Sequence, residues 1–202
     1  MTAVAAGADV ALLVIDAQVD FLAMAHDPGD AALANILALV EGAQRDGVPV
    51  VLTQEVHRPA GVDFGRELDG DEPVHCLEDA PGTTLVPELR DLPEAHLVRK
   101  RRYSAFFATD LDLLLRGLGV RTVVVCGYLT DVCVHYTCVD AHQHDYHVRM
   151  VADACAGSSP SAHHAALAAV EYLQHGAVVR TDSLLATPSP RRPDRRGSAW
   201  AT

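Results

Sequence analysis

Short apolar runs alternate along the chain with segments whose apolar residues recur every three or four positions. The runs are rich in Val, Leu and Ile and end at Gly or a polar residue, which is typical of strands buried on both faces. They predict strands at residues 10–15, 48–53, 95–98, 120–126, 147–151 and 177–180. The periodic segments predict helices at 30–46, 110–117, 131–145 and 160–175. Strands that alternate with helices favour a parallel sheet covered on both faces.

Two segments fall outside this alternation. Residues 55–94 are rich in Gly, Pro and acidic side chains and are too long for a plain connection, which indicates an active-site excursion. Residues 187–202 are rich in Pro, Arg and Ser and are predicted to be a disordered tail. Because 202 residues are enough for one substantial core, we expect a single domain at 1–186.

The amino-acid composition and net charge favour some classes of binding partner over others. A hydrophobic content of 49% and a charged content of 21% are those of a globular protein, and no apolar run is long enough to cross a bilayer. The net charge of −11 excludes nucleic acid as an expected partner and favours a cationic small molecule over an anionic one. Five cysteines without framework spacing, and a first segment without a basic n-region, predict a reducing compartment, the cytoplasm.

Cys133 lies where the buried run 122–126 has ended at Gly127 and a helical pattern begins. The free N–H groups and partial positive charge of a helix N-terminus favour a thiolate, so a cysteine there can be a nucleophile. The alternative is that Cys133 is a small buried core residue, which is a common environment for a free cysteine.

Asp16 and Lys100 are the candidate partners of this thiol. Asp16 follows the first strand, and ligands of parallel sheets bind beyond the carboxyl ends of the strands. A carboxylate there can take the thiol proton and deliver it to a leaving amine, and a lysine would favour both anions. Alternatively, Asp16 is a helix cap and Lys100 belongs to a solvated basic run.

Three motifs in this order resemble the isochorismatase-like cysteine hydrolases, a superfamily that includes nicotinamidases, N-carbamoylsarcosine amidases and streptothricin-inactivating enzymes. They are Asp-x-Gln-x-x-Phe from Asp16, Lys-x-x-Tyr-Ser-Ala-Phe from Lys100, and Gly-x-x-Thr-Asp-x-Cys-Val from Gly127. The resemblance covers roughly residues 11–183. It implies a three-layer α/β/α fold with a doubly wound, mainly parallel sheet.

The same resemblance implies a catalytic triad of Asp16, Lys100 and Cys133. It also implies a cis peptide at Tyr128–Leu129 and an oxyanion hole formed by the N–H groups of Leu129 and Cys133. Members that cleave isochorismate lack the cysteine, so its presence points to hydrolysis of a C–N bond through a thioester. The substrate expected is a small amide, ureido compound or lactam, and homodimers or homotetramers are the expected assemblies.

A metal site is a further implication. Glu55 and His57 in an extended segment point to the same side, and His75 follows in a His-Cys pair. This resembles the Asp-x-His and His-Cys pattern of nicotinamidases, with Glu55 in place of the aspartate. Zinc, manganese or iron would suit these ligands, although the chemistry itself requires no cofactor. The alternative is that both histidines are polar pocket residues.

Substrate contacts are expected at Phe21, Tyr128 and Glu72. Phe21 matches a residue that packs against the nicotinamide ring, but Glu72 replaces the partner aromatic. This replacement counts against nicotinamide and favours a substrate with a cationic or donor-rich group. Further candidates to face the pocket are Asp63, Arg66 and Glu67, of which Arg66 can pair with a substrate carboxylate or with an acidic neighbour.

Three functions therefore remain open from the sequence. The first is the amidohydrolase, with nicotinamidase proper as its less favoured form. The second is a non-catalytic binding protein that keeps the fold. The third, least favoured, is a thiol redox sensor that pairs Cys133 with Cys126 or Cys138.

Overall fold

A parallel sheet in the strand order β3-β2-β1-β4-β5-β6 forms the middle layer of the computed structural model, which describes residues 9–26 and 29–186. The predicted tail at 187–202 lies outside the described residues. The chain runs outward from β1 to β3 and then returns to place β4 beside β1, so the sheet is doubly wound. The strands are β1 (Val10–Ile15), β2 (Val50–Glu55), β3 (His96–Lys100), β4 (Thr122–Tyr128), β5 (His147–Ala156) and β6 (Val178–Val179).

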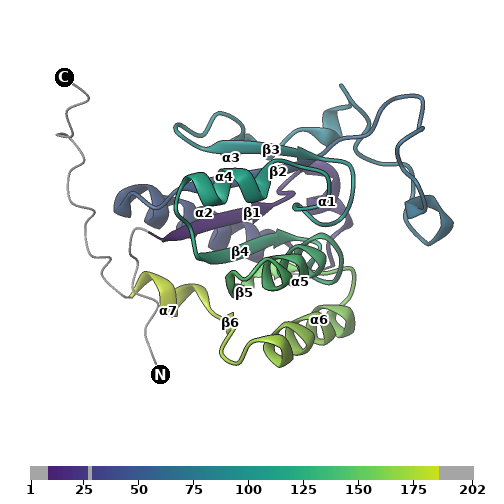
Figure 1. Ribbon diagram of the computed structural model, residues 1–202. Helices are drawn as coiled ribbons and strands as arrows, with labels where there is room; N and C mark the ends of the chain where they lie inside the picture. The colour runs from purple at the N-terminus through teal and green to yellow at the C-terminus, as the bar shows by residue number, and fades with distance from the viewer. Residues whose placement is uncertain (1–8, 27–28, 187–202) are drawn as a thin grey trace, which may run out of the picture.

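Helices cover both faces of this sheet (Figure 1). One face carries α2 with α7 beside it, and the other carries α4, α5 and α6. The helices are α1 (Val19–Met24), α2 (Gly29–Asp46), α3 (Pro87–Arg90), α4 (Leu111–Gly117), α5 (His135–Gln143), α6 (Pro160–Leu173) and α7 (Thr181–Leu185). A π-helical turn, η3 (Thr130–Val134), leads directly into α5. The predicted three-layer α/β/α fold is therefore confirmed.

The core lies where the sequence pattern placed it. Every residue of β1 is buried, and so is every residue of β4 except its first. Both strands were predicted from uninterrupted apolar runs, because a central parallel strand is covered on both faces. No helix within the described ranges is both long and apolar enough to cross a membrane.

The segment after β2 leaves the sheet and projects beyond it (Figure 1). It contains two single 3₁₀ turns, η1 (Glu67–Asp69) and η2 (Pro81–Thr83), and then the short α3. The predicted excursion at 55–94 is thus largely irregular backbone. It starts at the same edge of the sheet where the first strands of the parallel set end.

Candidate active site

Neighbouring strands bring four ionisable side chains to the carboxyl edge of the sheet. Asp16 follows β1, Glu55 ends β2, Lys100 ends β3, and Cys133 lies in the first helical turn after β4. All four are at most 1% exposed. The position between β1 and β4 is the point at which the strand order reverses, where open α/β sheets form their binding crevices.

Lys100 lies at the centre of this group. Its Nζ is 2.7 Å from Asp16 Oδ2 and 3.5 Å from Cys133 Sγ, and it also pairs with Glu55 Oε2. A further hydrogen bond from Nζ to the Arg102 carbonyl, at 2.9 Å, fixes the ammonium group. The structure therefore brings Asp16, Lys100 and Cys133 together in one buried cluster.

The thiol of Cys133 does not have the lowered pKa expected from its place at a helix start. Burial raises its pKa well above the ordinary value, and the Lys100 ammonium only partly opposes this effect. Burial also raises the pKa of Asp16, again against the pull of Lys100. The pKa of Lys100 is raised as well, because Asp16, Cys133 and Glu55 outweigh its own burial. The cluster thus combines an ammonium group with a thiol and a carboxyl group whose pKa values are all raised.

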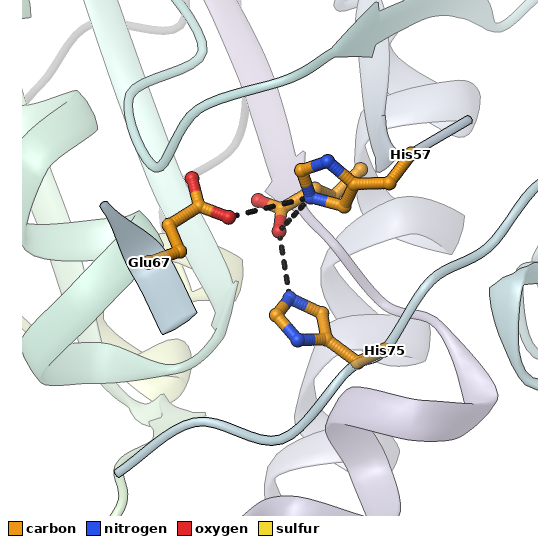
Figure 2. Close-up of side chains that lie close together, drawn as sticks. His57, Glu67 and His75 are labelled. Carbon is orange, nitrogen blue, oxygen red and sulfur yellow. Dashed lines mark hydrogen bonds and ion pairs between the residues drawn. The ribbon is translucent and has the colours of Figure 1, made fainter. Parts of the chain in front are cut away.

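A second cluster surrounds the other oxygen of Glu55. His57 Nε2 and His75 Nε2 lie 3.2 and 3.0 Å from Glu55 Oε1, and Glu67 Oε2 lies 3.3 Å from His57 Nε2 (Figure 2). Burial alone would lower the pKa of His57, but the carboxylates of Glu55 and Glu67 raise it to about 9. Glu55 Oε2 meanwhile lies 3.7 Å from Cys133 Sγ. One carboxylate therefore joins the two clusters.

The second cluster fits a metal ion. One ligand atom from each of Glu55, His57, Glu67 and His75 lies within 4.8 Å of the others, and all four residues are buried. Apart from its ion pair with His57, neither oxygen of Glu67 has a hydrogen-bond partner. A buried carboxylate without such partners is costly unless a cation compensates it. Oxygen and imidazole donors in this number suit zinc and related divalent ions.

The match to a family model decides the affiliation of this chain. Residues 10–183 match the model of the Isochorismatase domain. This chain belongs to the isochorismatase family. The resemblance drawn from the three sequence motifs is therefore confirmed.

Relatives within the isochorismatase family include enzymes of known chemistry. The nicotinamidase of Escherichia coli is 30% identical over 200 residues, covering 85% of this chain and 94% of that protein. The ureidoacrylate amidohydrolase of Methylobacterium radiotolerans is 33% identical over 156 residues, covering 69% and 60%. The structure of Pyrococcus horikoshii pyrazinamidase in complex with zinc superposes with a TM-score of 0.72 at 31% identity, over 85% of this chain and 99% of that one.

Gln18, the second polar residue of the first family motif, has a structural explanation. Its amide oxygen accepts a hydrogen bond from the Glu55 N–H at 2.7 Å, and its Nε2 donates to the carbonyls of Glu55 and Thr83 at 2.9 and 2.8 Å. Gln18 is completely buried. It therefore fixes the end of β2, and with it the shared carboxylate, relative to β1 and the excursion.

The predicted substrate residues occupy different surroundings. The Phe21 ring is buried and meets the His75 ring edge-on, with centroids 5.4 Å apart, so it lies beside the second cluster. Glu72 is half-buried and accepts a hydrogen bond from the Tyr103 hydroxyl at 3.3 Å, and burial raises its pKa. The Tyr128 hydroxyl donates to the Gly29 carbonyl at the start of α2, so its side-chain contacts lend no support to a role in substrate binding.

The three excursion residues that were expected to face the pocket also have different surroundings. Arg66 is exposed and pairs with Asp69 at 2.8 Å, the alternative in which it meets an acidic neighbour. Asp63 pairs with Arg58 and Arg101, which ties the excursion to the end of β3. Glu67, expected only as a further residue facing the pocket, lies beside His57 as a fourth potential metal ligand, a role that the sequence did not indicate because its segment has no periodic pattern. A buried acidic residue in a loop rich in exposed charges gives no local signal.

The backbone before Cys133 has the expected form, since the Tyr128–Leu129 peptide is cis. Outside Glu67 and Tyr103 lies a cavity of about 540 Å³, which the rings of Phe107 and Tyr136 also line. Both rings are more than half exposed. The cavity reaches the second cluster through Glu67, which lines it and pairs with His57.

Proposed function

We propose that this protein hydrolyses a C–N bond of a small amide, ureido compound or lactam through a thioester on Cys133. The observation that carries the proposal is the convergence of Asp16 Oδ2 and Cys133 Sγ on the Lys100 ammonium, at 2.7 and 3.5 Å. Because burial raises the pKa of the Cys133 thiol, the thiol requires a base, and the raised pKa of Asp16 suits this task. The nicotinamidase and ureidoacrylate amidohydrolase relatives support the same bond type.

The reaction follows from these positions. Asp16 takes the Sγ proton while the sulfur of Cys133 attacks the carbonyl carbon, and the N–H groups of Leu129 and Cys133 hold the oxyanion. Asp16 then gives this proton to the leaving nitrogen as the C–N bond breaks, which leaves a thioester. Asp16 deprotonates a water molecule, which attacks the thioester carbonyl; the C–S bond breaks, the acid product leaves, and Asp16 returns the proton to the sulfur of Cys133. Lys100 remains an ammonium group and stabilises the anionic forms of both partners.

A divalent metal ion, zinc in the first place, is the proposed occupant of the second cluster. Glu55, His57, Glu67 and His75 would hold it, and Glu55 can offer Oε1 while Oε2 stays with Lys100. When bound, such an ion supplies a Lewis acid that orients a substrate heteroatom or a water molecule. The zinc-bound pyrazinamidase neighbour supports this assignment.

For the substrate, we favour a group with positive charge or several hydrogen-bond donors. Glu72 stands beside the Tyr103 hydroxyl in a half-buried position, where a carboxylate can pair with an ammonium, guanidinium or ureido group. The similarity to nicotinamidase keeps nicotinamide as the second candidate. The protein is expected to work in the cytoplasm as a homodimer or homotetramer.

Product release from a panel of compounds tests the proposal: ammonia is measured for primary amides and ureido compounds, and the newly formed amine of the ring-opened product is measured for lactams. The panel contains nicotinamide, ureidoacrylate, amides with a cationic group and lactams, each with and without a chelator. We expect turnover with at least one of them and a loss of about 10⁴-fold or more in kcat for Cys133→Ala. Hydroxylamine should trap the thioester as a hydroxamate.

Cys138→Ala is the matched control, because Cys138 is equally buried in α5, which continues directly from the turn that holds Cys133, but belongs to neither cluster. It should keep the wild-type rate, whereas a redox sensor that pairs Cys133 with Cys138 would respond to it. Near-normal turnover by Cys133→Ala or Cys133→Ser would refute the thioester route. If no compound reacts, and iodoacetamide alkylates Cys133 no faster than a free thiol, the non-catalytic alternative is supported instead.

A further inference from the structure

Thr53 makes two hydrogen bonds to Asp16 with a single hydroxyl group. Its Oγ1 accepts a hydrogen bond from the Asp16 N–H at 3.0 Å and donates one to Asp16 Oδ1 at 2.7 Å. Thr53 lies in β2 beside the end of β1 and is completely buried. The Thr53 hydroxyl is therefore hydrogen-bonded to both the backbone and the carboxyl group of Asp16.

These two hydrogen bonds stabilise an unusual backbone conformation, because Asp16 lies in the left-handed region with a φ of 47°. Residues with a Cβ rarely adopt this conformation, and it persists where the surroundings impose it. Left-handed residues held by their surroundings are frequent at functional sites. At Asp16 the hydroxyl of Thr53 satisfies the N–H that the unusual backbone turns toward β2.

The two oxygens of Asp16 consequently differ. Oδ1 is occupied by the Thr53 hydroxyl, whereas Oδ2 has the Lys100 ammonium at 2.7 Å and accepts no further hydrogen bond. A carboxylate oxygen of Asp16 lies within 4.8 Å of Cys133 Sγ. With Oδ1 engaged, Oδ2 is the oxygen with room to receive the thiol proton.

We propose that Thr53 is the positioning residue of the catalytic base: its hydroxyl holds Asp16 so that Oδ2 faces Cys133 and Lys100. The inference rests on the proposed cysteine-hydrolase function. It adds a residue outside the triad whose contribution is the orientation of the base. Threonine combines the branched shape that suits a buried strand with the hydroxyl that this task requires.

Three variants separate positioning from fold stability. Thr53→Val keeps the branched shape and removes the hydroxyl, and Thr53→Ser keeps the hydroxyl. Thr137→Val is the matched control, because Thr137 is also completely buried and its hydroxyl oxygen accepts the Ala105 N–H at 3.0 Å without touching either cluster. The substrate is whichever compound of the panel the wild-type enzyme hydrolyses fastest, and folding is checked by thermal unfolding.

We expect Thr53→Val to lower kcat by about 10- to 100-fold with less than about a threefold change in KM, because a small misplacement of a catalytic group costs rate. Thr53→Ser should return kcat to within about threefold of wild type, and Thr137→Val should keep the wild-type kcat. Unchanged kcat in a folded Thr53→Val enzyme would overturn the inference, and so would an equal loss in Thr137→Val.

If Thr53→Val does not fold, Thr53→Ala takes its place, and a kcat equal to that of Thr53→Ser would overturn the inference. A failure of the proposed hydrolase function can be distinguished from a failure of this inference about Thr53. In that case the wild-type enzyme releases no product from any compound of the panel, or Cys133→Ala remains active.

Discussion

Glu55 uses its two carboxylate oxygens for different partners. Oε1 faces the imidazoles of His57 and His75, and Oε2 faces Lys100 and the thiol of Cys133. The Lys100 ammonium and the hydrogen bonds hold the pKa of Glu55 well below its usual range, despite complete burial. A permanent negative charge at this point balances the Lys100 ammonium and the imidazolium of His57. The carboxylate is therefore part of the electrostatics of both clusters.

Gly127 is the residue at which a single methyl group should have the largest effect on stability. Its φ is 127°, and a Cβ would overlap the Ile15 carbonyl oxygen and lie 2.7 Å from the Ile15 nitrogen. Both are backbone atoms of the neighbouring central strand, so neither can move aside alone. We expect Gly127→Ala to destabilise the protein by roughly 4 kcal/mol or more, as seen for changes that strain a fixed backbone.

Urea unfolding measures this change, with Gly117→Ala as the control. Gly117 lies in α4 with no atom near the position of an added Cβ, so that variant should be neutral or slightly stabilising. Equal stability of Gly127→Ala and the wild type would contradict the close approach of β4 to β1.

At the scale of elements, the carboxylate of Glu171 links α6 to β6 through hydrogen bonds. Its Oε1 and Oε2 accept the N–H groups of Gly176 and Val178 at 2.7 and 3.1 Å, across the turn between the two elements. These backbone hydrogen bonds hold the pKa of Glu171 below its ordinary value of 4.5. A lowered pKa contributes stability that is present above about pH 4.5 and is lost as the pH falls through the lower folded-state pKa.

We therefore expect Glu171→Gln to lower the melting temperature at pH 7 by a few degrees, which corresponds to roughly 1 kcal/mol for partly exposed hydrogen bonds to a charged group. The difference from wild type should shrink as the pH is lowered from 5 to 3. Calorimetry across this range measures it, and Glu41→Gln, at an exposed position of α2, is the control. A difference in melting temperature between wild type and Glu171→Gln that stays constant with pH would show that the charge of Glu171 does not stabilise the contact between α6 and β6.

The elements that could be predicted from the sequence are those with long patterns. β1 and β4 are continuous apolar runs, and α2 and α6 show helical spacing over several turns. The helices α1, α3 and α7 were not predicted, because four to six residues carry too little periodicity. β5 extends to Ala156, five residues beyond its predicted end at Val151. Asp153 interrupts its apolar pattern there, while its carboxylate accepts hydrogen bonds from Thr181.

At the scale of the molecule, strand ends and family motifs located the predicted triad and the group of Glu55, His57 and His75, but not the place of Glu67 in that group. Asp16, Glu55 and Cys133 could be placed at one edge because parallel strands end together, and Lys100 was assigned to the same site through its family motif. Glu67 reaches His57 only through the irregular backbone after β2, which no local pattern describes. The raised pKa of Cys133 was missed for a related reason, since burial on all sides depends on the packing of the whole molecule.

Metal binding should be visible in the stability of the entire chain. The four ligand residues come together only when β2 and the excursion are folded, so an ion that binds them stabilises the native state by mass action. Zinc at about 100 times its dissociation constant adds about 2.7 kcal/mol. For a protein of this size, that corresponds to a rise of about 5–10 °C in melting temperature, which a chelator should reverse.

Glu67→Gln is the informative variant for this effect. It removes the charge of the carboxylate that lacks hydrogen-bond partners, so the rise with zinc should shrink markedly at the same zinc concentration. Glu72→Gln, which changes a neighbouring acidic residue outside the ligand group, should respond to zinc as the wild type does. Calorimetry with and without zinc, together with metal analysis of the dialysed protein, makes the comparison. An equal rise in wild type and Glu67→Gln would show that zinc binding does not need the charge of Glu67. No rise in wild type would show that zinc does not bind this group of residues. In either case, the contribution of the Glu67 carboxylate would be limited to its ion pair with His57.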